Sequence, residues 1–228
     1  MLPQPNTDLR GSLIQAAAEL DLALGEQQVD RLLAYLMLIH KWNQVYNLTA
    51  VREPAAMLTQ HLFDCLSLIG PLRRHTQGRA LRVMDVGSGG GLPGVVLAIA
   101  CPELTVVCVD AVAKKTSFIQ QVVAELRLTN LCGEHARVEN LKVAPFDVIT
   151  SRAFASLPDF ARLTLQHLKP GAVWLAMKGQ MPQGEIDALP PVIEVFHVEQ
   201  LHVPGLDAQR CLVWMRPANT VAPASRSD

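Results

Sequence analysis

Hydrophobic side chains in residues 1–79 recur at the spacing of helices. Two sets carry this pattern: Leu9, Leu13, Ile14, Ala17 and Leu20, and then Val29, Leu32, Leu33, Leu36, Ile39 and Trp42. Gly25 suits the start of the second helix, and Asn47 suits the turn after it. Pro54 fits the first turn of a third helix, which we expect to end at Gly70-Pro71 before a polar connector over residues 73–79.

The hydrophobic pattern changes at Ala80, after which short apolar runs alternate with helical segments. The runs predict strands over residues 81–86, 105–110, 130–135, 146–150, 172–177, 192–198 and 210–215, with helices over 93–100 and 113–126. In the second helix we expect Phe118, Ile119, Val122 and Val123 to face inward. Such alternation predicts an α/β fold with a mostly parallel seven-stranded sheet covered on both faces. The last strands have little helix between them, so we expect that edge to be antiparallel.

Composition indicates where the domains begin and end and which classes of protein are unlike this chain. The chain is 50% hydrophobic and 18% charged, which is typical of a globular protein. We predict a helical extension over residues 1–79, a main domain over 80–216 and a disordered tail, rich in Ala, Pro and Ser, over 217–228. The five cysteines form no CxxC pair, and neither a signal peptide nor a membrane-length apolar run is apparent. These features favour a cytoplasmic protein with reduced thiols and no membrane segment.

A glycine cluster follows the first predicted strand and precedes a helix, as in loops that cradle nucleotides. Residues 85–94 read Asp-Val-Gly-Ser-Gly-Gly-Gly-Leu-Pro-Gly. Counted from Gly89, the loop fits the dinucleotide pattern G-x-G-x-x-G; counted from Gly87, it is similar to the motif that binds S-adenosylmethionine (SAM) in class I methyltransferases. Gly87 directly follows the strand, which favours SAM. Asp85 could contact the cofactor, brace the loop or cap the next helix.

Three further residues follow strand ends, where ligands bind in open α/β sheets. Asp110 ends the second strand and could accept hydrogen bonds from the ribose hydroxyls of either cofactor. Arg152 follows the fourth strand and Lys178 the fifth. Either cation could pair with the methionine carboxylate or with RNA phosphate, or could be an ordinary surface residue.

Several expected chemical devices are absent from the sequence. Methylation of an exocyclic amine usually needs an Asn/Asp-Pro-Pro-aromatic element after the fourth strand, where this chain has Ser-Arg-Ala-Phe. No cysteine is placed as a nucleophile, and the histidines lack metal-ligand spacing, so we expect no metal. We interpret His61 and Asp64, at i and i+3, as a local polar pair on one helix face. A ring nitrogen such as guanine N7 needs no general base, so positioning of the reactants is sufficient.

Several motifs together resemble the RsmG (GidB) family of bacterial 16S rRNA methyltransferases. They are Trp42-Asn43-x-x-Tyr46-Asn47-Leu48-Thr49-Ala50, Met57-Leu58-x-x-His61-x-x-Asp64-x-Leu66, the glycine loop, Arg137-Val138-Glu139, Ser151-Arg152-Ala153-Phe154-Ala155-Ser156-Leu157 and Lys178-Gly179-Gln180-Met181-Pro182. The resemblance implies transfer of the SAM methyl group to N7 of guanine 527, in the 530 loop of 16S rRNA in the 30S subunit. By motif position it implies SAM contacts at Gly87, Leu92, Val138, Glu139 and Arg152. Ser88, Gln60 and Cys65 stand where threonine, arginine and serine are usual in the family.

The combined hypothesis is a class I, Rossmann-like rRNA methyltransferase. Its predicted pocket is shaped by Gly87, Ser88, Gly89, Gly91 and Leu92, with Asp85 beside the cofactor, Asp110 on ribose and Val138 and Glu139 flanking adenine. Arg152 and Lys178 serve the catalytic rim, and Arg52, Lys114, Lys115 and Arg152 are candidate phosphate contacts. The net charge of −1 requires any RNA site to be a local basic patch. We expect a monomer. Alternatives are a methyltransferase for another RNA or a small molecule, a nicotinamide oxidoreductase, and a non-catalytic RNA-binding factor.

Overall fold

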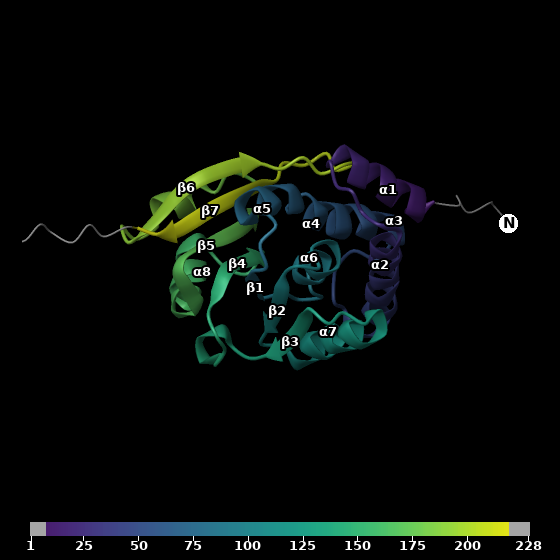
Figure 1. The fold of residues 1–228 in the computed structure, drawn as a ribbon, viewed down its shortest axis with the longest axis horizontal. Coiled ribbons are helices and arrows are strands. Elements are labelled where there is room, and N and C mark those ends of the chain that lie inside the picture. The colour runs from purple at the N-terminus through teal and green to yellow at the C-terminus, as the bar shows by residue number, and fades with distance from the viewer. Residues whose placement is uncertain (1–7, 219–228) are drawn as a thin grey trace, which may run out of the picture.

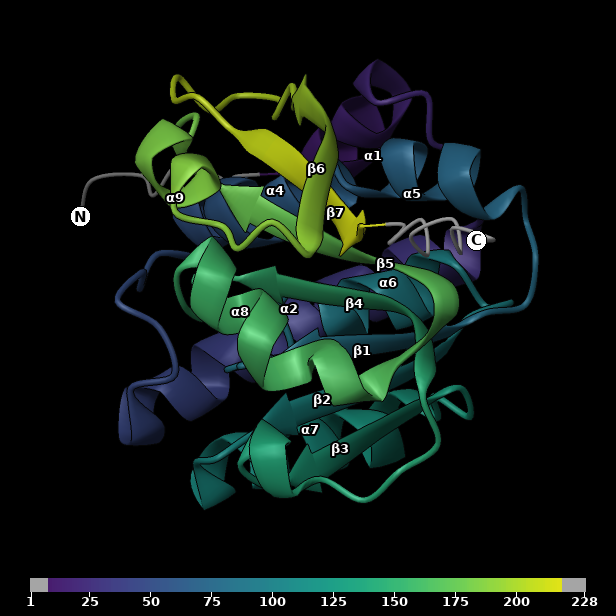
Figure 2. The same cartoon turned by 90° about the vertical axis from the view of Figure 1, so that its left-hand side faces the viewer.

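The computed structural model describes residues 8–218, which build one seven-stranded sheet with helices on both faces (Figures 1 and 2). The strands are β1 (Arg82–Val86), β2 (Thr105–Asp110), β3 (Leu131–His135), β4 (Phe146–Arg152), β5 (Leu168–Lys178), β6 (Ile193–Gln200) and β7 (Cys211–Pro217). Their order across the sheet is β3-β2-β1-β4-β5-β7-β6. The predicted α/β class and all seven strands are therefore confirmed.

Strand pairing creates the crevice in which the site lies. Strands β1 to β5 are parallel to one another, whereas β7 is antiparallel to both β5 and β6, as predicted for this edge. The chain order reverses between β1 and β4, which are adjacent in the sheet. In open α/β sheets such a reversal leaves a crevice at the carboxyl ends of the strands, where ligands bind.

The N-terminal helices pack against this sheet and share a hydrophobic core with it. They are α1 (Leu9–Glu19), α2 (Glu26–Tyr46), α3 (Pro54–Met57), the π-helix η1 (Leu58–Phe63), α4 (Asp64–Leu66) and α5 (Ile69–Thr76). Gly25 precedes α2 and Asn47 ends it in the left-handed conformation, as the sequence predicted. The predicted stop at Gly70-Pro71 is wrong, because α5 continues to Thr76. Pro71 lies in the first turn of α5, where its missing N–H group is not needed.

The later helices follow the strand ends. They are α6 (Gly94–Ala100), α7 (Ala113–Leu126), η2 (Val138–Asn140), α8 (Leu157–Thr164), η3 (Leu165–His167) and α9 (Gln183–Asp187). The bounds of α7 agree with the predicted ones, and Phe118, Ile119 and Val122 are buried as expected. Val123, which we also expected to face inward, is only partly buried. Pro217, placed in the tail by the sequence, belongs to β7, and residues 219–228 of that tail lie outside the described residues.

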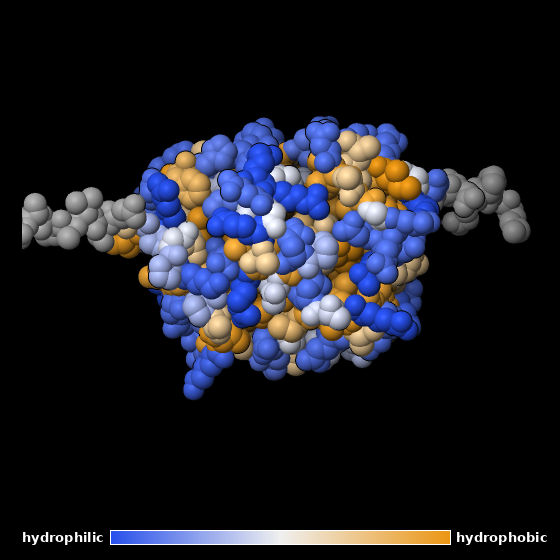
Figure 3. Space-filling view, viewed as in Figure 1, coloured by the Kyte–Doolittle hydropathy of each residue, from blue (hydrophilic) through white to orange (hydrophobic). Residues whose placement is uncertain are grey.

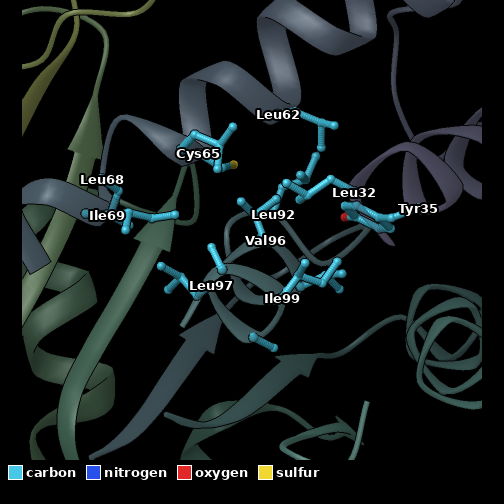
Figure 4. Close-up of a cluster of buried hydrophobic side chains, with 14 of the residues drawn as sticks. Leu32, Tyr35, Leu62, Cys65, Leu68, Ile69, Leu92, Val96, Leu97 and Ile99 are labelled. Carbon is cyan, nitrogen blue, oxygen red and sulfur yellow. The ribbon is translucent and has the colours of Figure 1, made fainter. Parts of the chain in front are cut away.

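A single hydrophobic cluster joins the N-terminal helices to one face of the sheet. Figure 4 shows Leu32 and Tyr35 of α2 and Leu62 of η1 gathered around Leu92 and Val96. The Tyr35 hydroxyl donates a hydrogen bond to the Gly90 carbonyl at 2.6 Å, so α2 is fastened directly to the glycine loop. A second cluster fills the other face, between the sheet and α8.

The surface in Figure 3 is mainly polar, with apolar residues in separate patches, as is usual for a globular protein. Between residues 8 and 218, no helix combines the length and the apolar character needed to cross a membrane. In the same part of the chain, no group of three or more His, Cys, Asp or Glu side chains is placed to hold a metal ion.

Candidate active site

The glycine loop turns sharply at the end of β1, and Gly87 makes that turn. Its φ is +66°, a conformation that favours glycine, and a Cβ added there would lie 2.4 Å from Phe154 Cδ2. The loop then closes on itself, because the backbone N–H groups of Gly91 and Leu92 both donate to the Ser88 carbonyl. The Phe154 ring and the loop backbone are therefore in contact at Gly87.

Asp85 lies beneath the loop and is fully buried. Its Oδ2 accepts a hydrogen bond from the Gly94 N–H at 2.8 Å, at the start of α6, whereas Oδ1 has no partner among the described residues. Burial raises the pKa of this carboxyl to about 7, although the hydrogen bond from Gly94 opposes the rise. The geometry thus supports the capping and bracing roles of Asp85, and it lines none of the cavities described below.

Asp110 closes the other side of the loop from the end of β2. Its Oδ2 accepts from the Gly89 N–H and its Oδ1 from the Val112 N–H, each at 2.9 Å. The Lys115 ammonium lies 3.6 Å from Oδ2. Each carboxylate oxygen can accept further hydrogen bonds, so Asp110 braces the loop and still presents acceptors to the crevice.

The largest cavity of the crevice, about 550 Å³, lies over the ends of β1, β2 and β4. Gly87 and Asp110 line one side, and Val138 and Glu139 of η2 line another, so four predicted cofactor residues meet here. The Val138 carbonyl lies 2.8 Å from His167 Nε2, which holds η2 in place. The volume is within the range of roughly 300–1,000 Å³ typical of small-ligand pockets.

A smaller cavity of about 120 Å³ continues from Gly87 on the other side of the loop. Its lining includes the predicted residues Ser88, Gly89, Leu92 and Arg152, together with Thr49. The Ser88 hydroxyl is buried and has no partner within residues 8–218. Gly91 lines neither cavity; a Cβ added there would meet Val95 Cγ2 at 2.3 Å, so its role is in the close packing of the loop on α6.

Arg152 belongs to an ion-pair network that sequence reasoning missed. Its Nη1 donates to the Gln60 carbonyl at 3.0 Å and to Asp64 Oδ2 at 2.9 Å. The other Asp64 oxygen accepts from Arg210 Nε at 2.9 Å. The Asp64 side chain is only 3% exposed, and the side chains of the two arginines are 23% and 26% exposed. The carboxylate is thus fully engaged, and each cation keeps part of its surface toward the crevice.

Lys178 lies in a third cavity, of about 410 Å³, together with Arg152 and Arg210. Its ammonium donates to Glu185 Oε2 at 2.8 Å and to the Ala155 carbonyl at 3.1 Å. Lys178 is therefore tied to α9 and the β4–α8 loop, at the rim where the sequence placed it. Of the other candidate phosphate contacts, Lys115 lies near Asp110 in the largest cavity, whereas Arg52 and Lys114 are exposed and line none of the three cavities.

The predicted His61–Asp64 pair is wrong. His61 Nε2 lies 2.8 Å from Thr49 Oγ1, and Asp64 turns to the two arginines. The reason is the π-helix Leu58–Phe63, which changes the angular spacing of side chains within this segment. Burial lowers the pKa of His61 to about 4, and the nearby Arg152 adds to this effect. His61 is therefore neutral at neutral pH.

The cysteines lie outside the crevice, as the sequence suggested. None lines the three cavities described above, and burial raises the pKa of all five thiols. Thiolate nucleophiles are therefore disfavoured in this protein.

The sheet order, the glycine loop after β1 and the acid after β2 define the fold of class I SAM-dependent methyltransferases. The crystal structure of TrmN from Thermus thermophilus shares this fold, with a TM-score of 0.52 and 18% identity; the match covers 71% of this chain and 53% of that chain. The chain belongs to the GidB family, rRNA small subunit methyltransferase G, whose model matches residues 28–213.

Two relatives match over nearly their whole length. Ribosomal RNA small subunit methyltransferase G of Leptothrix cholodnii is 58% identical over 219 residues, which is 96% of this chain and 99% of that protein. The protein of the same name from Methylibium petroleiphilum is 60% identical over 207 residues, which is 91% of this chain and 94% of the relative. The chain is therefore a methyltransferase, and the predicted family resemblance is confirmed. The nicotinamide oxidoreductase alternative is set aside.

Proposed function

We propose that this methyltransferase binds SAM across Gly87 and transfers its methyl group to N7 of guanine 527, in the 530 loop of 16S rRNA. When bound, SAM supplies an electrophilic methyl group on a sulfonium. Two cavities meet at Gly87, and the residues that line them fit such a molecule. The larger cavity offers the carboxylate oxygens of Asp110 as hydrogen-bond acceptors. The smaller cavity is lined by Ser88, whose buried hydroxyl has no oxygen or nitrogen partner among the described residues.

The larger cavity suits the adenosine part. Asp110 presents carboxylate oxygens that can accept hydrogen bonds from the ribose hydroxyls. Val138 and Glu139 form the wall opposite, where they flank the adenine ring. The positive φ of Gly87 turns the backbone sharply at the point where the two cavities meet, so the ligand can pass from one cavity to the other over this turn.

The smaller cavity suits the methionine part. The buried Ser88 hydroxyl can donate to a carboxylate or accept from an ammonium group, and among the described residues it has the weakly bonding Cys108 thiol as a polar neighbour. Arg152 adds a guanidinium for the carboxylate. Lys178 and Arg210 lie beyond Arg152 in the third cavity, where cations suit the phosphates of a nucleotide.

One observation favours a ring nitrogen as the methyl acceptor: the residues lining the smaller cavity include a cation but no carboxylate. The nearby Asp64 carboxylate is paired with two arginines, and the His61 side chain is buried, so neither group is placed as a general base. A guanine N7 carries a free lone pair and loses no proton, so the chain has only to orient the base. The names of the family and of its relatives, which specify small-subunit rRNA, support the choice of RNA.

The test is methyl transfer from labelled SAM to 30S subunits that lack the modification. We expect one N7-methylguanosine, mapped to the 530 loop by borohydride reduction and aniline cleavage. Naked 16S rRNA and assembly intermediates serve as parallel substrates. Incorporation elsewhere, or into a small molecule only, would support the alternative acceptors.

The binding partner, the oligomeric state, the location and the metal requirement of the protein are further proposals. We infer that the 30S subunit or its rRNA is the partner, and that the protein acts as a monomer in the cytoplasm without a metal ion. Light scattering during size-exclusion chromatography checks the monomeric state, and activity after dialysis against a chelator checks the metal. A dimer, or loss of activity after chelation, contradicts the respective inference.

A further inference from the structure

The C-terminal end of α2 stands at the rim of the crevice. In the first turn of α2, Gln28 contacts the carbonyl groups of Ile99 and Ala100, at the far end of α6 from the glycine loop. Tyr35 reaches the loop itself at Gly90. The helix then continues to Tyr46, about 16 Å beyond Tyr35 at 1.5 Å per residue. The last turns of α2 therefore extend past the loop on the side where the crevice opens.

These turns expose an aromatic ring on a rigid support. Tyr46 is 41% exposed and the adjacent Val45 is 72% exposed, so the last turn of α2 presents an aromatic ring and an apolar side chain to solvent. The Tyr46 and Trp42 rings lie with centroids 5.0 Å apart, and Trp42 packs edge-on against the buried Phe118 of α7 at 5.3 Å. The exposed ring is thus the outermost of three aromatic side chains anchored in the core.

Exposed cations lie on α2, on the segment after it and at the start of α7. Lys41, Arg52 and Lys114 are exposed, and none of them forms an ion pair in the part of the chain that the structure describes. His40 Nδ1 donates to the Arg52 carbonyl at 3.1 Å, so Arg52 lies against α2. Lys114 lies one turn before Phe118 on α7. The stretch of residues 31–52 contains no Asp or Glu.

We propose that Tyr46 is a stacking platform for an unpaired nucleobase of the RNA substrate, beside the nucleotide that is methylated. An exposed aromatic ring with flanking cations is how proteins hold single-stranded RNA, since every base has a face that can stack and every nucleotide carries a phosphate. Lys41, Arg52 and Lys114 take the adjacent phosphates. This inference rests on the proposed RNA substrate, because the platform adjoins the same crevice through Leu48 and Thr49.

The experiment compares Tyr46→Ala with Tyr46→Phe, which keeps the ring. Binding of the wild type and variants to a 530-loop RNA oligonucleotide and to 30S subunits is measured, together with SAM affinity by calorimetry. We expect Tyr46→Ala to weaken RNA binding about ten-fold, as base–aromatic stacking does in other single-strand binders, and Tyr46→Phe to bind like the wild type. SAM affinity stays unchanged in both.

Two further variants sharpen the comparison. Met37→Ala removes another exposed apolar side chain of α2, at 48% exposure, about 13 Å along the helix from Tyr46, and should leave RNA binding unchanged. Arg52→Gln should reduce the salt dependence of RNA binding, because it removes one phosphate contact. Melting temperatures confirm that all variants fold.

Unchanged RNA binding in Tyr46→Ala overturns the platform, as does a Tyr46→Phe defect equal to that of Tyr46→Ala. Either result would indicate that the exposed side chains of Val45 and Tyr46 bind a protein partner instead. The proposed function fails differently. If RNA binding depends on the Tyr46 ring but methylation occurs at another nucleotide, the guanine assignment is wrong and the platform stands. A wild-type protein that binds neither the oligonucleotide nor the subunit overturns both.

Discussion

At the scale of single residues, Asp110 has two structural tasks. Its two oxygens each accept a backbone hydrogen bond, one from Gly89 in the loop and one from Val112 before α7. The remaining acceptor positions belong to the cavity, where we propose that ribose binds. One side chain therefore fixes the shape of the loop and, in the proposed function, also recognises the ligand.

Replacing Asp110 tests this double role. We expect Asp110→Ala to weaken SAM binding at least about ten-fold, because hydrogen bonds to a charged group contribute roughly 1.5–3 kcal/mol. Calorimetric titration with SAM measures the affinity. Asp207→Asn, an exposed acid outside the crevice, is the matched control. An Asp110→Ala protein that binds SAM like the wild type would refute the ribose role.

Asp85 makes folding dependent on pH. Burial raises its pKa to about 7 in the folded chain, whereas the unfolded chain has the ordinary value of 3.8. The folded state thus holds a proton that the unfolded state releases, so the contribution of Asp85 to stability is fully present below pH 3.8 and is lost as the pH rises through about 7.

An uncharged amide at this position removes the effect. Asp85→Asn keeps an oxygen for the Gly94 N–H but does not titrate, so we expect it to gain stability relative to the wild type between pH 5 and pH 8. Thermal melting without SAM across this range measures the difference. Asp207→Asn should show no such trend. A constant difference between Asp85→Asn and the wild type would mean that Asp85 is already charged at low pH.

At the scale of elements, α2 holds α6 and its loop from both ends. Gln28 Nε2 donates to the carbonyl groups of Ile99 and Ala100, each at 3.0 Å, and these belong to the last turn of α6, where the helix provides no partners. Gln28 Oε1 also accepts from the Gly25 N–H at 2.9 Å. One side chain therefore caps the start of α2 and the end of α6.

Removing this side chain should loosen both helices. We expect Gln28→Ala to lower the free energy of unfolding by roughly 1–3 kcal/mol, the cost of leaving partly buried polar groups unsatisfied. Urea denaturation followed by circular dichroism measures it. Gln27→Ala, at the exposed neighbouring position, should change little. Equal effects of the two variants would show that the contacts at Ile99 and Ala100 carry no stability.

At the scale of the whole molecule, Asp64 joins parts of the chain that are distant in sequence. It lies in α4, and it pairs with Arg152 at the end of β4 and with Arg210 just before β7. The N-terminal helices, the middle of the sheet and its antiparallel edge therefore meet at one buried carboxylate. A buried charge that loses its partner is costly, so this network is sensitive to substitution.

We expect Asp64→Ala to destabilise the protein by roughly 3 kcal/mol, the lower end for breaking a buried ion pair, since the arginines are partly solvated. It should also weaken SAM binding, because Arg152 loses the group that orients it. Denaturation and calorimetry give the two readouts. Glu194→Ala, which breaks an exposed pair with Arg216, should alter neither. Full stability in Asp64→Ala would contradict the bridging role.

The sequence by itself determined the positions of the strands, of the glycine loop and of the helices α6 and α7, because these depend on local hydrophobic periodicity and turn chemistry. The run from Thr105 to Asp110 and the helix from Ala113 to Leu126 have the predicted bounds. Gly87, Asp110 and Arg152 were placed at the crevice because residues after parallel strands meet at one edge, whereas Val138 was placed there by its motif position in the family resemblance. Their contacts with SAM stay a prediction.

Only the tertiary structure decided how these residues are partnered. Asp64 meets Arg152 and Arg210 across 88 and 146 positions of the sequence, and no local pattern encodes such pairs. Tyr46 and Thr49 belong to the motif from Trp42 to Ala50 that carried the family resemblance, whereas no motif pointed to Arg210. The π-helix separated His61 from Asp64, and Pro71 was accommodated in a first turn. Packing of distant elements fixes these choices, because an unpaired buried charge is costly and its partner comes from whichever element the fold places beside it.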